Sequence, residues 1–163
     1  MVPAIRRWLD AVRRNHALEH ATVAVLLARH GPARLAGRAG AEGFFIVTEH
    51  TPEEVASCAD EALRRLQRGE SSLAVSPLCG TNIAVAGLLA AAAATAVLAA
   101  PGGRGRFLNA FTAAMLAALA AQPVGRLVQR RLTTRADLDG LQIVATRRLA
   151  GPLLKVYTRP ARS

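Results

Sequence analysis

The sequence predicts an α+β fold in which a small mixed sheet with two helices is interrupted by a transmembrane α-helical hairpin. Three observations lead to this prediction. A helical pattern fills the first thirty residues, two long stretches lack any charge, and β-branched or aromatic segments lie on both sides of them. We expect a cytoplasmic α+β part at 1–82, the hairpin at 83–124, and a helix with strands at 125–163 that completes the cytoplasmic part.

Residues 3–30 are expected to form the first helix. Pro3 suits a first helical turn, and the Gly31-Pro32 pair ends the helix. Apolar residues recur at spacings of three and four and define one face: Ile5, Leu9, Val12, Val23, Leu26 and Leu27. His16 and Glu19 project into this face and His20 onto its border, so polar groups stand where aliphatic ones are expected.

A β-α-β unit is expected next. Residues 34–43 are rich in Gly, Ala and Arg and are interpreted as a loop, whereas 44–49 has the composition of a strand. Thr51 suits a helix N-cap and Pro52 a first helical residue, so a helix should run from there to about Arg68. Residues 72–76 are expected to form a short strand.

Residues 83–100 and 107–124 carry no charge and are just long enough to cross a bilayer. The Pro/Gly/Arg segment 101–106 between them favours a transmembrane hairpin over a buried Ala-rich helical pair. Arginines are more frequent around the outer ends of the two stretches than in this turn, so the positive-inside rule places both termini in the cytoplasm.

After the second stretch, a helix is expected at 124–132, followed by strands at 141–149 and 153–158. The strands before and after the hairpin are too few to be stable separately. We therefore expect them to pair in one sheet.

His16, Glu19 and His20 form an H-x-x-E-H pattern. Two histidines one helical turn apart can bind one zinc ion, and the glutamate between them can act as general base on a bound water. Cys79, in a glycine-containing turn before the first apolar stretch, is the candidate third ligand. The alternatives are two histidines that hydrogen-bond to backbone carbonyls and a packed, inert thiol. His30 is interpreted as a residue interacting with the helix dipole, and His50 as part of a solvated strand end.

The segments H-A-L-E-H-A-T at 16–22 and C-G-T-N at 79–82 resemble those of an uncharacterised bacterial and cyanobacterial membrane-protein family, a domain of unknown function. This resemblance spans most of the chain and implies an integral membrane protein without an assigned activity. His16 to His20 is also similar to the inverted zinc motif of pitrilysin-type metallopeptidases, in which a glutamate further along the chain completes the site. No matching glutamate is evident here, because the corresponding interval runs into the uncharged stretch.

The expected function is that of a multi-pass protein of the inner (plasma) membrane with a small cytoplasmic domain that carries a zinc-type site. The alternative is a membrane-anchored, metal-dependent hydrolase or peptidase with Glu19 as general base. The lipid bilayer is the expected partner, with a second copy or another membrane protein as further candidates. The net charge of +10 comes almost entirely from dispersed arginines, so nucleic-acid binding is not expected, and no organic cofactor is expected either.

Overall fold

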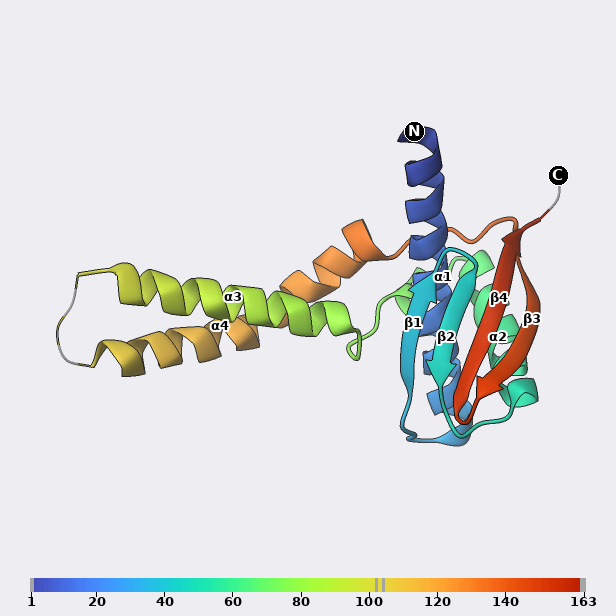
Figure 1. The fold of residues 1–163 in the computed structure, drawn as a ribbon, viewed down its shortest axis with the longest axis horizontal. Helices are drawn as coiled ribbons and strands as arrows, with labels where there is room; N and C mark the ends of the chain where they lie inside the picture. The colour runs from blue at the N-terminus through green and yellow to red at the C-terminus, as the bar shows by residue number, and fades with distance from the viewer. Residues whose placement is uncertain (1, 102, 104, 162–163) are drawn as a thin grey trace. The chain divides into compact units, whose positions relative to one another are not determined.

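The computed structural model describes residues 2–101, 103 and 105–161 (Figure 1). The chain forms two compact units, one made of 1–76 together with 130–163 and the other of 77–129. The first is an α+β unit and the second a helical pair, so the chain leaves the α+β unit once and returns to it.

The α+β unit contains two helices and four strands within its described residues. In chain order these are α1 (Val2–His30), β1 (Ala36–Gly40), β2 (Gly43–Val47), α2 (Pro52–Gln67), a 3-10 turn (Ser71–Ala74), β3 (Leu141–Ala150) and β4 (Leu153–Pro160). The strand order is β1-β2-β4-β3, and every described neighbour pair is antiparallel. The prediction of a mixed sheet is therefore wrong, because β1–β2 and β4–β3 are hairpins and the two hairpins meet antiparallel.

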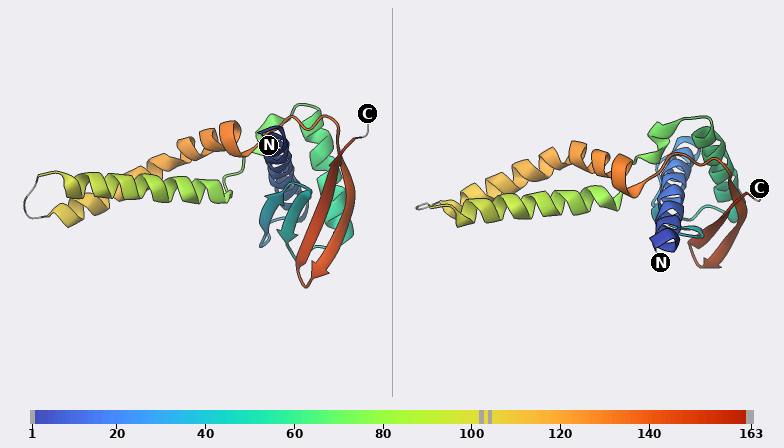
Figure 2. Two further views of the ribbon diagram at one scale, coloured as in Figure 1. Left: turned by 45° about the horizontal axis from the view of Figure 1, so that its top comes forward. Right: turned by 90° about the horizontal axis from the view of Figure 1, so that it is seen from above.

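Strands from before and after the apolar stretches do share one sheet, as predicted. Phe44 of β2 lies opposite Val156 of β4, and Ile46 lies opposite Leu154. All four side chains are fully buried. Helices α1 and α2 cover the same face of the sheet (Figures 1 and 2), and the core lies between these helices and these strands.

Two segments differ from the sequence prediction. The expected loop at 34–43 contains β1, an edge strand whose Arg, Gly and Ala residues give little strand signal. The expected strand at 72–76 is instead a 3-10 turn at Ser71–Ala74, where local bonds such as Leu73 N–H to Glu70 O replace sheet pairing. The predicted β-α-β unit is consequently absent from the described fold.

The predicted inner face of α1 is also only partly correct. Leu26 is buried, but Ile5 and Leu9 near the N-terminal end of the helix are exposed. The middle of α1 is instead covered on nearly all sides, so residues 17–22 are buried regardless of helical period. The polar groups of the H-x-x-E-H pattern lie in this covered part.

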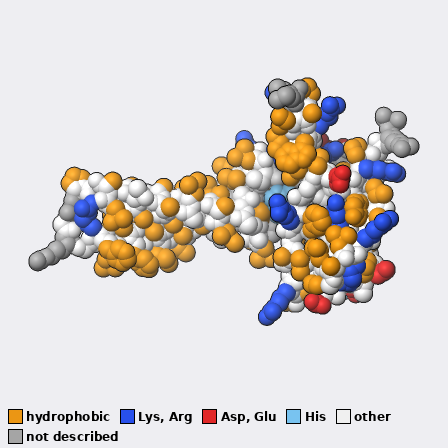
Figure 3. All heavy atoms as spheres, in the orientation of Figure 1, with side chains coloured by type: hydrophobic (Ala, Val, Ile, Leu, Met, Phe, Trp, Pro, Cys, Tyr) orange, Lys and Arg blue, Asp and Glu red, His pale blue; other side chains and the backbone are white. Residues whose placement is uncertain are grey.

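The second unit contains α3 (Gly80–Ala99) and α4 (Arg106–Val128), which continues into a π-helical turn (Gln129–Thr133). Residues 102 and 104 of the predicted turn lie outside the described residues. Both helices are long and apolar enough to cross a membrane, and most of their surface is not covered by protein. Figure 3 shows hydrophobic (orange) and uncharged (white) surface along most of this pair, with basic (blue) atoms near the end of the pair that is remote from the α+β unit in the chain.

Asn82 fixes the base of this helical pair. Its amide group donates to Pro77 O at 3.0 Å, and its Oδ1 accepts from Gln129 Nε2 at 2.8 Å. Gly125 of α4 lies against Asn82, and any side chain at that position would overlap the Asn82 amide. The C-G-T-N segment thus begins α3 and also holds α4 close to it.

Candidate metal centre

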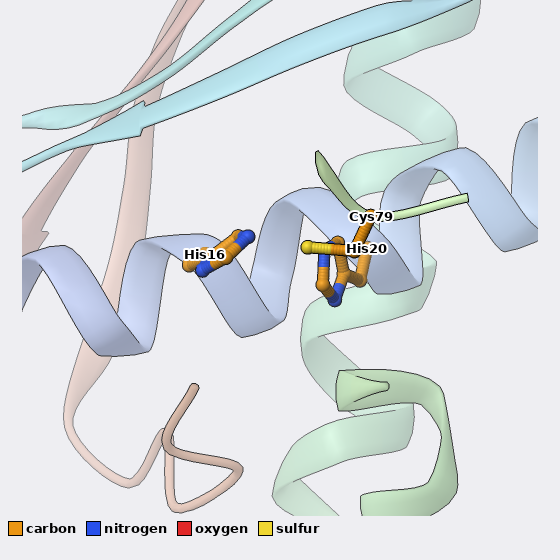
Figure 4. A group of neighbouring side chains, drawn as sticks. All are labelled: His16, His20 and Cys79. Atoms are coloured by element: carbon orange, nitrogen blue, oxygen red, sulfur yellow. The ribbon is translucent and has the colours of Figure 1, made fainter. Parts of the chain in front are cut away.

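His16 and His20 lie on successive turns in the covered part of α1, with ring centroids 4.4 Å apart and planes inclined by 61° (Figure 4). His20 is buried and His16 is half-buried. Helix geometry alone brings them together, because residues i and i+4 project from the same face. The two imidazoles of the predicted site therefore contact each other on one helix.

Each imidazole contacts one backbone carbonyl through Nδ1. His16 Nδ1 is 2.9 Å from Thr133 O, and His20 Nδ1 is 2.9 Å from Ala74 O. A carbonyl oxygen only accepts, so the ring nitrogen in each contact carries the proton and donates it. In a neutral ring this arrangement fixes the tautomer and leaves the lone pair on Nε2, the atom through which a histidine of this tautomer can bind a metal ion.

The two carbonyls mark the places where the chain leaves and re-enters the α+β unit. Ala74 is the last residue of the 3-10 turn just before residue 77, and Thr133 is the last residue of the π-helical turn that succeeds α4. Arg13 also binds the segment at which the chain re-enters the unit. Its guanidinium donates to Arg131 O at 2.9 Å, and its own carbonyl accepts from Arg135 N–H at 3.1 Å. One stretch of α1 therefore holds both chain segments that flank the apolar helices.

Glu19 is buried and packs against β1. A Cβ atom built on Gly37 would overlap the Glu19 carboxylate and would lie 2.9 Å from Glu19 Cγ. Only glycine leaves enough room for the acidic side chain at this point of the strand. Glu19, which is adjacent to His20 in sequence, therefore packs against strand β1 of the sheet.

Asn15 was not singled out in the sequence, yet it is fully buried and makes three hydrogen bonds. Its amide nitrogen donates to Gly40 O at 2.8 Å and Ala41 O at 3.0 Å, and its Oδ1 accepts from the Thr158 hydroxyl at 2.7 Å. Asn15 therefore ties α1 to the β1–β2 turn and to β4. The only feature of the sequence that points to Asn15 is its position directly before His16.

Cys79 belongs to the second unit, where it is the N-cap of α3. Its sulfur accepts from Thr81 N–H at 3.4 Å, and the residue is buried and not part of a disulfide. The partial positive charge at a helix N-terminus favours a negative charge on such a sulfur. Cys58, the other cysteine, is in the core of the α+β unit, and burial raises the pKa of its thiol.

The structure also assembles a group that the sequence did not indicate. His30, His50 and Glu54 converge at the end of α1, with ligand atoms that all lie within 4.8 Å of one another. His50 and Glu54 are four residues apart, but His30 lies twenty residues earlier, so no spacing rule could have associated it with them. The interpretation of His30 as a residue interacting with the helix dipole, and of His50 as part of a solvated strand end, is therefore incomplete.

Residues 11–146 match the family model described as a domain of unknown function, DUF6391. The chain is also 34% identical over 149 residues to an uncharacterised protein of the cyanobacterium Picosynechococcus sp., a match covering 85% of this chain and 72% of the relative. No solved structure matches the chain. The family match includes the histidine-bearing part of α1, both apolar helices and the start of β3, and the chain belongs to the DUF6391 family.

Proposed function

We propose that this protein is an integral membrane protein whose α+β unit binds a zinc-type divalent cation through Nε2 of His16 and His20. The observation that carries the proposal is the pair of Nδ1–carbonyl hydrogen bonds, at 2.9 Å each. Metal-binding histidines characteristically donate their other ring N–H to a carbonyl or carboxylate, which orients the ring and raises its basicity. Two such rings in mutual contact on one helix form half of a tetrahedral site.

The third ligand in this proposal is Cys79, on grounds of chemistry and chain connectivity. His20 is bonded to Ala74, and Cys79 follows Ala74 by five residues, so its Cα lies within about 17 Å of the Ala74 Cα in any arrangement of the chain. A thiolate completes a nitrogen- and sulfur-rich set of the kind that zinc prefers over magnesium or calcium. Three protein ligands would leave a fourth position for water or another ligand.

The packing of Glu19 favours metal binding without hydrolysis. A hydrolase would need Glu19 as general base, with its carboxylate directed at a metal-bound water. The packing of Glu19 against Gly37 of β1 supports a role in joining helix and sheet instead.

The membrane part of the proposal rests on α3 and α4, whose apolar surfaces are largely uncovered by protein. Covering them with lipid removes this surface from water, and a helical pair satisfies its own backbone hydrogen bonds. Because the histidines belong to the α+β unit, the proposed ion lies on the cytoplasmic side in this topology. The proposed location is the plasma membrane, with two spans.

Metal binding can be tested on the whole protein, purified in detergent with a tag that contains no histidine. In His16→Asn and His20→Asn the side-chain amide can replace the Nδ1 donor, but no group replaces Nε2. We expect each variant to fold as the parent does and to bind one equivalent of zinc fewer, measured by competition with a chelating dye. Losing a metal ligand should weaken binding more than the roughly 10–100-fold typical of losing an outer-shell partner.

The cysteine arm of the test uses Co²⁺ in place of Zn²⁺. A sulfur-to-cobalt charge-transfer absorption is expected for the parent and for Cys58→Ala, and it should disappear in Cys79→Ala. Unchanged zinc stoichiometry in both histidine variants would refute the site. If the histidine variants lose zinc but the parent shows no charge-transfer absorption, His16 and His20 are metal ligands and Cys79 is not.

A further inference from the structure

A second cluster of metal-ligating side chains lies at the far end of α1. His30 is the last residue of that helix, His50 follows β2, and Glu54 lies in the first turn of α2. Their ligand atoms lie within 4.8 Å of one another, and the two imidazole centroids are 4.7 Å apart. His30 is ten residues beyond His20, about 15 Å along the helix axis, so this cluster is distinct from the His16–His20 pair.

The separation of His50 and Glu54 suits a shared ion better than a direct bond. His50 Nδ1 lies 3.5 Å from Glu54 Oε2. A charge-assisted hydrogen bond between such atoms is usually about 2.7–2.9 Å long. Two ligands each about 2.0–2.1 Å from a tetrahedral zinc ion are about 3.4 Å apart, so the observed distance matches the edge of a zinc site.

Neighbouring residues hold two of the three ligands in place. Glu54 Oε2 accepts from Thr51 N–H at 2.8 Å in a capping box, and the Thr51 hydroxyl accepts from Glu54 N–H at 3.2 Å. A carboxylate has about four lone-pair positions, so this cap leaves others for an ion. The backbone of His50 donates to Thr48 Oγ1 at 3.2 Å and accepts from Arg148 Nη2 at 2.9 Å.

The charges around the cluster are compatible with a cation. Arg148, which is bonded to the backbone of His50, and Arg29, which precedes His30, are directed at other acceptors: Arg148 donates to the carbonyls of His50 and Gly151, and Arg29 pairs with Glu61. The backbone N–H of Thr51 lowers the pKa of Glu54, which keeps this carboxylate ionised at neutral pH. The cluster thus presents one negative oxygen and two imidazoles.

We propose that His30, His50 and Glu54 form a second, solvent-accessible site for a zinc-type divalent cation, which joins the C-terminal end of α1 to the junction of β2 and α2. Two nitrogens and one oxygen form a donor set that zinc and neighbouring late transition metals accept. Water occupies the remaining position, because His30 is exposed. The ion crosslinks the end of α1 to the segment 50–54, twenty residues further along the chain, so its binding raises the thermal stability of the α+β unit.

The experiment uses the whole protein carrying His16→Asn, His20→Asn and Cys79→Ala, which removes the first site. Zn²⁺ is titrated into this background by calorimetry and by thermal unfolding. We expect one bound equivalent and an upward shift of the melting temperature. Adding Glu54→Gln should weaken binding at least tenfold and remove the shift, while glutamine at this helix position preserves the capping box.

Glu53→Gln is the matched control, because it removes the same charge from the neighbouring residue of the same helical turn without touching the cluster. It should bind zinc as the background does, whereas His50→Gln should behave like Glu54→Gln. Absence of zinc binding in the background would overturn the proposal, and so would equal binding by Glu53→Gln and Glu54→Gln. Since the first site is already deleted, neither result depends on whether His16 and His20 bind metal.

Discussion

At the scale of single residues, the covered part of α1 accepts polar side chains because each has a specific counterpart. Asn15 is bonded to two carbonyls and one hydroxyl, and His16 and His20 each hold a carbonyl. A buried polar group without such partners would cost several kcal/mol. The H-x-x-E-H pattern therefore has a structural role with or without a metal ion.

Glu19 and Gly37 provide a direct test of how α1 and β1 fit together. Gly37→Ala should destabilise the α+β unit by about 1–3 kcal/mol, because the new methyl group overlaps the Glu19 side chain. Thermal unfolding followed by circular dichroism in detergent would measure the loss.

Gly40→Ala is the control on the same strand, since its Cβ would meet only Gly43 O at 3.7 Å, an ordinary contact. In a Glu19→Ala background, Gly37→Ala should become nearly neutral, because the overlapping carboxylate is gone. An equal cost of Gly37→Ala in both backgrounds would show that the two residues do not interact.

At the scale of elements, local chemistry predicted some segments well and others poorly. The helix expected at 52–68 is found at Pro52–Gln67, and the strands expected after the hairpin are found at Leu141–Ala150 and Leu153–Pro160. These segments carry their own caps, turns or β-branched residues. By contrast, β1 has almost no strand composition and exists because β2 offers it a pairing edge, which is tertiary information.

The cap of α2 should contribute measurably to stability. Thr51→Ala removes the hydroxyl that accepts from Glu54 N–H and should cost about 1 kcal/mol, whereas Thr51→Ser should cost much less. The other half of the box depends on pH. The pKa of Glu54 lies below its usual value, so its stabilising effect is present at neutral pH and disappears as the pH falls through that pKa.

Comparing Glu54→Gln with the parent across acidic pH, without metal, would measure this second contribution. The stability difference between the two proteins should shrink as the solution is acidified. A difference independent of pH would mean that the ionised carboxylate does not contribute to the cap.

At the scale of the whole molecule, the helical pair is an insertion between the two hairpins that form one sheet. The chain leaves the α+β unit after residue 76 and returns at residue 130, and β3 and β4 then complete the sheet that β1 and β2 begin. Uncharged composition made the insertion visible in the sequence, and the shortage of strands on either side implied a shared sheet. The His30–His50–Glu54 group could not be predicted, because it depends on where α1 ends relative to the β2–α2 junction.

The arrangement of the chain in the membrane gives the last prediction. If α3 and α4 span the bilayer, the turn between them lies outside the cytoplasm and the α+β unit inside, as the arginines flanking the stretches require. In a Cys58→Ala, Cys79→Ala background, Gly103→Cys in the turn should react with an impermeant thiol reagent added to intact cells. Arg159→Cys, at the exposed end of β4, should react only after the cells are opened. The reverse pattern would invert the topology, and labelling of neither position before lysis would mean that the two apolar helices do not cross the membrane.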